Sequence, residues 1–77
     1  MTTISTDRLE WLRHQLSRGW RVEGPVIERA MFYWVPHPTS AFEFVLRHED
    51  GCQVVAVPDC PALRSFIRER ALLVVTL

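Results

Sequence analysis

The sequence predicts an α+β fold in which two helices pack on one face of an antiparallel sheet of three strands, or of four if the C-terminal tail also pairs, in the order α-β-β-β-α(-β). Three observations predict it. Leucines at helical spacing follow a capping residue near the start, a strand-turn-strand pattern runs from 41 to 57, and an amphipathic segment follows Pro61. The 77 residues correspond to a single small domain over 1–77, which buries only about 60% of the surface of the unfolded chain.

The first helix is expected over residues 7–18. Thr6 is a suitable N-cap, and Gly19 supplies a stop signal after Arg18. An apolar stripe at helical spacing consists of Leu9, Leu12 and Leu16. Gln15 lies off this stripe and is expected to face water together with Arg8 and Arg18.

The next segment predicts a short extended piece over 20–22, a break at Gly24-Pro25 and a long strand over 26–35. Pro36 and Pro38 end this strand because proline has no backbone N–H for sheet pairing. Both sides of the strand are apolar. One side carries Val26, Ala30, Phe32 and Trp34, and the other carries Ile27, Met31, Tyr33 and Val35.

A β-hairpin is predicted over residues 41–57. A two-residue type I′ turn at Asp50-Gly51 would set Leu46 opposite Val55 and Phe44 opposite Val57. One face of the hairpin then carries Phe42, Phe44, Leu46, Val55 and Val57. The other carries the mixed set Glu43, Val45, Arg47, Cys52, Val54 and Ala56. We therefore expect the helices to cover the first face.

The second helix is expected over residues 61–70, because a proline in the first turn lacks only a donor that would be unpaired anyway. Its predicted buried stripe consists of Leu63, Phe66, Ile67 and Ala71. The LLVVTL tail that follows is compatible with a final edge strand or with a segment that extends into a partner.

The second face of the sheet predicts self-association. An open antiparallel sheet normally alternates apolar and polar residues, whereas this sheet is apolar on both sides of its first strand. A twofold homodimer is the commonest cover for such a face, and another protein partner is the alternative. The expected interface residues are Ile27, Met31, Tyr33, Val45 and Val54. The predicted function is therefore a non-enzymatic protein-interaction or regulatory module.

Single-stranded nucleic-acid binding is the alternative function. Its candidate contacts are Arg21, Arg29, Arg47, Phe32 and Trp34, because arginines beside sheet aromatics suit stacked bases. The charge pattern disfavours it: nine Lys+Arg residues, all of them Arg, balance nine Asp+Glu residues. Glu23, Glu28 and Glu43 are interleaved with those arginines, and a GC-rich genome explains the absence of lysine.

The remaining residues predict no catalytic, cofactor or metal site. The two cysteines, Cys52 and Cys60, are too far apart along a strand for a disulfide. They also lack the closely spaced pairs typical of structural zinc sites. A thiolate role for Cys60 beside the second helix is outweighed by simple capping or packing. Free thiols without a signal peptide or a transmembrane segment lead us to expect a cytoplasmic protein.

Overall fold

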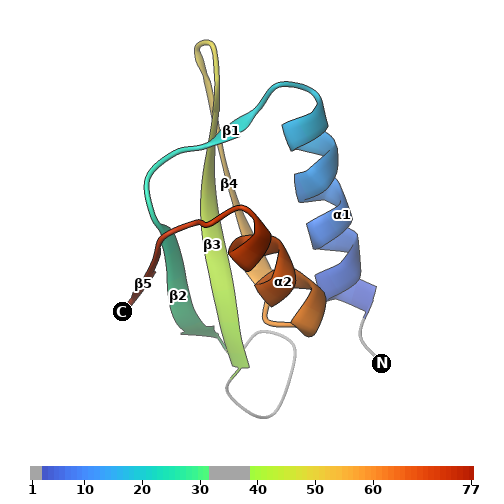
Figure 1. Cartoon of the computed structure of the whole chain (residues 1–77), viewed down its shortest axis with the longest axis vertical. Coiled ribbons are helices and arrows are strands. Elements are labelled where there is room, and N and C mark those ends of the chain that lie inside the picture. The colour runs from blue at the N-terminus through green and yellow to red at the C-terminus, as the bar shows by residue number, and fades with distance from the viewer. Residues whose placement is uncertain (1–2, 32–38) are drawn as a thin grey trace.

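Figure 1 shows a computed structural model of the chain, which describes residues 3–31 and 39–77. Its elements, in chain order, are α1 Thr3–Ser17, β1 Arg21–Val22, β2 Val26–Met31, β3 Thr39–His48, β4 Gly51–Pro58, α2 Pro61–Glu69 and β5 Val74–Thr76. The α+β class is confirmed. The sheet differs from the prediction, since the described residues form five strands and the sheet is mixed.

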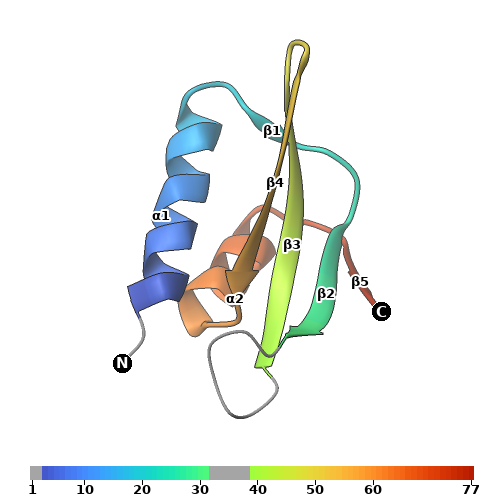
Figure 2. The same cartoon turned by 180° about the vertical axis from the view of Figure 1, so that it is seen from behind.

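The sheet is built around β3. β4 pairs antiparallel with one edge of β3, and β1 and β2 pair antiparallel with the other edge, one after the other. β5 lies beside β2 in parallel, with Ile27 opposite Val75, so the tail is an edge strand of its own chain. Figure 2 shows this arrangement from behind. Because β4 and β5 therefore run in the same direction, α2 is the crossover helix between two parallel strands.

β1 and β2 are two pieces of one interrupted strand. Arg21 lies opposite Arg47 and Ile27 opposite Glu43, so the pairing register shifts by two residues between the pieces. The interruption contains Gly24-Pro25, as expected, and the Glu23 N–H still donates to the Val45 carbonyl at 2.8 Å. The described part of the predicted strand over 26–35 is β2, Val26–Met31; residues 32–35 lie outside the described residues.

The hairpin register differs from the prediction by two residues. His48 lies opposite Gly51 and Phe44 opposite Val55, so the turn residues are Glu49 and Asp50. Glu49 itself adopts a left-handed backbone with φ of 50°. The predicted type I′ turn at Asp50-Gly51 is therefore wrong. The predicted faces are nevertheless confirmed, because a shift of two residues leaves every side chain on its original side.

Helix α1 begins earlier than predicted. It starts at Thr3, so Thr6 is an interior residue and not the N-cap. It ends at Ser17, one residue before the predicted end. The predicted stop at Gly19 is confirmed: Gly19 has a φ of 100°, its N–H donates to Leu16, and the Trp20 N–H donates to the Gln15 carbonyl at 3.1 Å. This pair of bonds is a Schellman motif, which requires a residue that tolerates positive φ at the position of Gly19.

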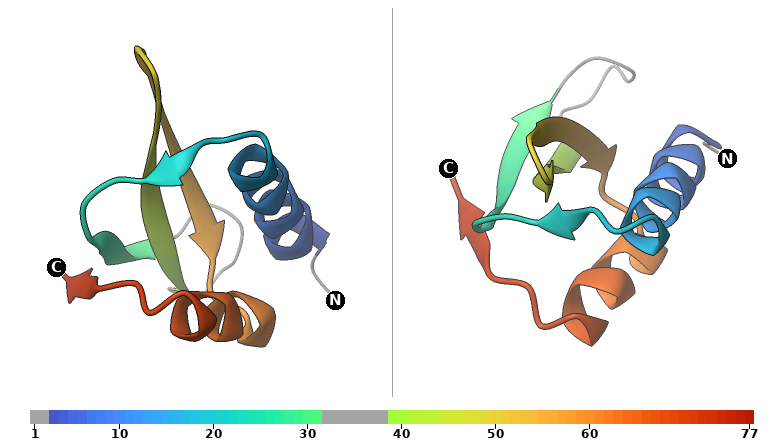
Figure 3. Two further views of the ribbon diagram at one scale, coloured as in Figure 1. Left: turned by 45° about the horizontal axis from the view of Figure 1, so that its top comes forward. Right: turned by 90° about the horizontal axis from the view of Figure 1, so that it is seen from above.

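Both helices lie on the same face of the sheet, as predicted (Figure 3). The core that they form with the sheet consists of Leu9, Leu12, Val26, Phe42, Phe44, Leu46, Val57, Leu63, Phe66 and Ile67. The prediction that Gln15 faces water is wrong, because its side chain is buried. Its Nε2 donates to Oε1 of Gln53 at 2.7 Å, which joins α1 to β4 and provides the buried amide with a partner.

Helix α2 begins at Pro61 as predicted and ends at Glu69, one residue early. Ala71 lies beyond it and is exposed, so its place in the predicted buried stripe is wrong. The Leu72 N–H donates to Ile67 and the Ala71 N–H to Arg68, both at 3.1 Å. This second Schellman motif places Ala71, with a φ of 52°, at the position that usually holds glycine.

Replacing Ala71 with glycine is therefore expected to stabilise the protein by about 1 kcal/mol, because glycine has no Cβ to strain a left-handed backbone. Thermal unfolding followed by circular dichroism should show an increase in Tm of roughly 4–8 °C for a domain of this size. The matched control is Ala62→Gly in the exposed first turn of α2, where glycine should lower the Tm. A decrease of equal size in both variants would contradict the expected result.

Candidate functional site

The second face of the sheet is the face that the helices leave uncovered. From the register, the side chains that alternate toward it include Arg21, Ile27, Arg29, Ala41, Glu43, Val45, Arg47, Cys52, Val54, Ala56, Pro58 and Val75. Ala41 and Pro58 are buried at one end of this surface. The accessible apolar part lies elsewhere, where Val54 is 59% exposed and Val75 is 39% exposed.

The side chains of the second face are arranged in rows across the strands. Val45 lies opposite Val54 in one row. In the next row, Val75, Ile27, Glu43 and Ala56 lie side by side. Charged rows flank these two, with Arg21 and Arg47 on one side and Arg29 on the other. The face thus has a mainly apolar centre and a charged rim, the distribution typical of protein interfaces.

Two of the three arginines of the rim, Arg47 and Arg29, are paired with glutamates of the same chain. Arg47 donates from Nε and Nη2 to the two carboxylate oxygens of Glu23, at 3.1 and 2.9 Å. This hydrogen-bonded pair lowers the pKa of Glu23 and raises that of Arg47. Arg29 lies 3.5 Å from the Glu43 carboxylate. Both pairs are solvent-exposed, so they contribute little to stability but cancel the local charge.

The structure brings together three of the five predicted interface residues. Ile27 and Val45 are half-buried on the second face, and Val54 is exposed there. Met31 ends β2, but its side chain and all of Tyr33 lie outside the described residues. Val75 extends the same surface beyond the predicted set. The alternation of Leu73, Val75 and Leu77 in the sequence indicates that they share one face of a strand. Only the pairing of β5 with β2 shows that this is the second face of the sheet.

The candidate nucleic-acid contacts are only partly brought together. Arg21, Arg29 and Arg47 do lie on one face, as that alternative requires. Two of these three guanidinium groups are engaged by glutamates. The stacking residues Phe32 and Trp34 lie outside the described residues.

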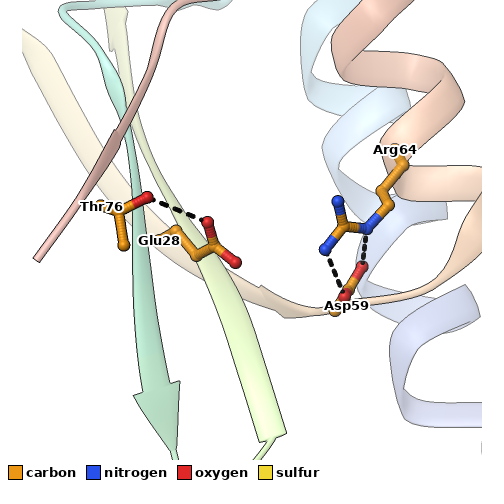
Figure 4. A network of polar contacts seen from close by, with 4 residues as sticks. All are labelled: Glu28, Asp59, Arg64 and Thr76. Atoms are coloured by element: carbon orange, nitrogen blue, oxygen red, sulfur yellow. Dashed lines mark hydrogen bonds and ion pairs between the residues drawn. The ribbon is translucent and has the colours of Figure 1, made fainter.

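A groove of about 470 Å³ lies between α2 and the paired strands β2 and β5. Its lining comprises Glu28, Phe42, Arg64, Ile67, Arg68, Ala71, Leu72 and Val74. Figure 4 shows that Glu28 accepts a hydrogen bond from Thr76 and that Arg64 forms a bidentate pair with Asp59. The second pair raises the pKa of Arg64. Among these described lining residues, none is a serine, cysteine or histidine that could act as a nucleophile or a neutral base.

A second groove, of about 480 Å³, lies between the C-terminal ends of the two helices and β1. Leu16, Gly19, Trp20, Arg21, Val22, Arg70 and Leu72 line it. The guanidinium of Arg70 lies 5.1 Å from the centroid of the Phe66 ring, and that of Arg13 lies at the same distance from that ring. The lining of the groove itself is mainly apolar and includes two arginines, Arg21 and Arg70.

The cysteines are both free thiols, as predicted. Cys52 is exposed on the second face, and Cys60 is the N-cap of α2 without a side-chain capping bond. In the part of the chain that the structure describes, no three His, Cys, Asp or Glu side chains are grouped so as to hold a metal ion. No helix within residues 3–31 and 39–77 is long and apolar enough to cross a membrane.

Comparison with known proteins provides no relative for this chain. No protein family, no curated protein and no solved structure matches it. Its function is therefore inferred from the geometry of its own surfaces.

Proposed function

We propose that this protein is a small, non-enzymatic interaction module that self-associates through the second face of its sheet. The observation that supports this function is the exposed apolar centre of that face, where Val54 is 59% exposed beside half-buried Val45 and Ile27. Monomeric proteins rarely leave a large contiguous apolar surface in water. Covering these rows releases water from them and favours association.

The charges of the second face favour a second copy of the chain as the partner. Positive and negative side chains both lie at this surface, where Arg29 pairs with Glu43 and Arg47 pairs with Glu23. A face that carries both signs around an apolar centre can meet itself about a twofold axis without net repulsion. A typical stable interface buries about 800 Å² per partner. An interface of that size would cover only a small part of the 5207 Å² that the chain exposes.

Replacing Val54 with glutamate should weaken the dimer at least about tenfold in Kd, because the new carboxylate would have to be desolvated without a partner. Light scattering after size-exclusion chromatography, over a series of protein concentrations, measures the mass relative to the 9.0 kDa monomer. The matched control is Trp11→Glu, which adds the same charge at another exposed apolar residue, on helix α1. This control should associate like the unchanged protein.

Two outcomes would contradict the proposed function. One is an unchanged protein that remains a monomer at every concentration. The other is an equal loss of association in Val54→Glu and Trp11→Glu, because this would show a general effect of added charge. Circular dichroism of both variants establishes that their folds are intact.

Single-stranded nucleic acid remains the second candidate partner because Arg21, Arg29 and Arg47 share one face. It has less support, since glutamates already engage two of the three. An oligonucleotide that quenched tryptophan fluorescence at low salt, with weaker quenching at high salt, would favour it over self-association.

A further inference from the structure

The two edges of the sheet differ in how they are protected. Along β4, helix α1 occupies an outward backbone acceptor, because Nη1 of Arg8 donates to the Ala56 carbonyl at 2.8 Å. At the opposite edge, β5 pairs with β2 and with no other strand of residues 3–31 and 39–77. An uncovered edge presents unpaired backbone groups, to which another strand can bind.

The backbone of β5 shows which groups are available. The Leu73 carbonyl accepts a hydrogen bond from the Val26 N–H at 2.8 Å, and the Leu77 N–H donates to the Glu28 carbonyl at 3.2 Å. These residues therefore direct their backbone groups toward β2. Since successive residues of a strand direct theirs to opposite sides, Val74 and Thr76 present N–H and C=O groups to the open edge.

The side chains of this segment are unusually apolar for an open edge. Leu73 is 71% exposed, Val75 39% and Leu77 75%. Alternation along the strand places all three on the side of Ile27, which is the second face. The sequence Leu-Val-Val-Thr-Leu is also nearly symmetric about Val75, because a leucine lies two residues away on either side.

We propose that two copies of the chain pair antiparallel through β5, about a twofold axis at Val75. In this register, Val74 of one copy and Thr76 of the other exchange both backbone hydrogen bonds. Val75 of one copy then lies against Val75 of the other, and Leu73 of each copy lies against Leu77 of the other. All three exposed side chains therefore gain an apolar neighbour. The near-symmetry about Val75 is what selects a second copy as the partner, since an unrelated strand would not require it.

This edge pairing is separate from the second-face contact. It joins two sheets side by side and leaves their second faces on the same side of the joint sheet, still accessible. A protein that uses both contacts would assemble as four copies with two kinds of twofold interface. Each contact can then be removed independently of the other.

The test is the variant Thr76→Pro, with Thr76→Ala as its matched control. Proline removes the outward N–H of residue 76 and is tolerated where the N–H does not bond within the chain. Alanine keeps that N–H, and both variants lose the hydroxyl that bonds Glu28. We expect Thr76→Pro to halve the assembled mass, or to raise the Kd at least about tenfold, and Thr76→Ala to leave both unchanged.

Equal masses for the unchanged protein and Thr76→Pro would overturn edge pairing, and so would an equal loss in Thr76→Ala. Comparison with Val54→Glu separates this inference from the proposed function. Loss of association in Val54→Glu alone leaves the second-face contact standing and overturns the edge contact. Loss of association in Thr76→Pro alone supports the edge contact and overturns the second-face contact.

A second experiment keeps the inference testable if Thr76→Pro does not fold. Leu73→Lys and Leu77→Glu should each weaken association. The double variant should restore it, because the register places each introduced charge against the opposite charge of the other copy. Within one chain the two positions lie four residues apart along a strand, too far for a direct pair. A double variant that associates no better than the single ones would overturn the register.

Discussion

Replacing Phe44 with alanine is expected to remove about 3–5 kcal/mol from the free energy of unfolding. Phe44 is fully buried in the centre of the core, and its ring lies edge-on to Phe66 with 6.2 Å between the centroids. A domain of this size has a total stability of roughly 4–12 kcal/mol, so the variant would lose a large share of it. Urea unfolding followed by circular dichroism, at a concentration where the protein is monomeric, measures the loss.

The control for this prediction is Phe44→Leu. Leucine keeps most of the buried apolar volume, so its cost should be clearly smaller than that of alanine. A loss of less than about 1 kcal/mol in Phe44→Ala would show that the ring does not occupy a tightly packed site.

Replacing Gly51 with alanine should destabilise the protein by about 1–3 kcal/mol, because the site has no room for a methyl group. A Cβ built on Gly51 would lie 2.9 Å from Cη2 of Trp20 and 3.3 Å from the His48 carbonyl oxygen. The Trp20 ring also lies against His48 at a tilt of 31°, with 5.4 Å between the centroids. The indole therefore packs directly against the backbone at the tip of the hairpin.

A double-mutant cycle identifies Trp20 as the cause of this loss. The two indole atoms nearest to Gly51 belong to the outer ring, which phenylalanine lacks. In a Trp20→Phe background, Gly51→Ala should therefore cost less than it does in the unchanged protein. An identical cost in both backgrounds would mean that the clash with His48, or backbone strain, determines the effect.

Gly51 also explains why the hairpin register was predicted wrongly. A glycine after Asp50 is a strong signal for a turn, because glycine tolerates positive φ. Here its function is close packing against Trp20, a contact between residues 31 positions apart that no local pattern reveals. The faces of the hairpin were predictable nonetheless, because the alternation of Phe42, Phe44 and Leu46 survives a shift of two residues.

The parallel pairing of β5 with β2 was not predictable from local sequence for a similar reason. Thr76 and Glu28 are 48 residues apart. The periodicity of the tail predicts a strand but does not predict the strand with which it pairs. For the candidate site, the alternation identified Ile27, Val45 and Val54 as members of one face. It did not identify the ion pair between Arg47 and Glu23, because that contact depends on the interruption between β1 and β2.

The parallel pairing of β2 and β5 also has a consequence for the order of folding. The hairpin of β3 and β4 closes through a two-residue turn, whereas β5 joins β2 only after a loop of 48 residues has closed. The entropic cost of closing that loop makes such long-range pairing slow. We therefore expect β5 to be the last strand to dock. The open edge would then exist only on a chain whose core is already formed, which limits the time for which a half-folded chain can aggregate through it.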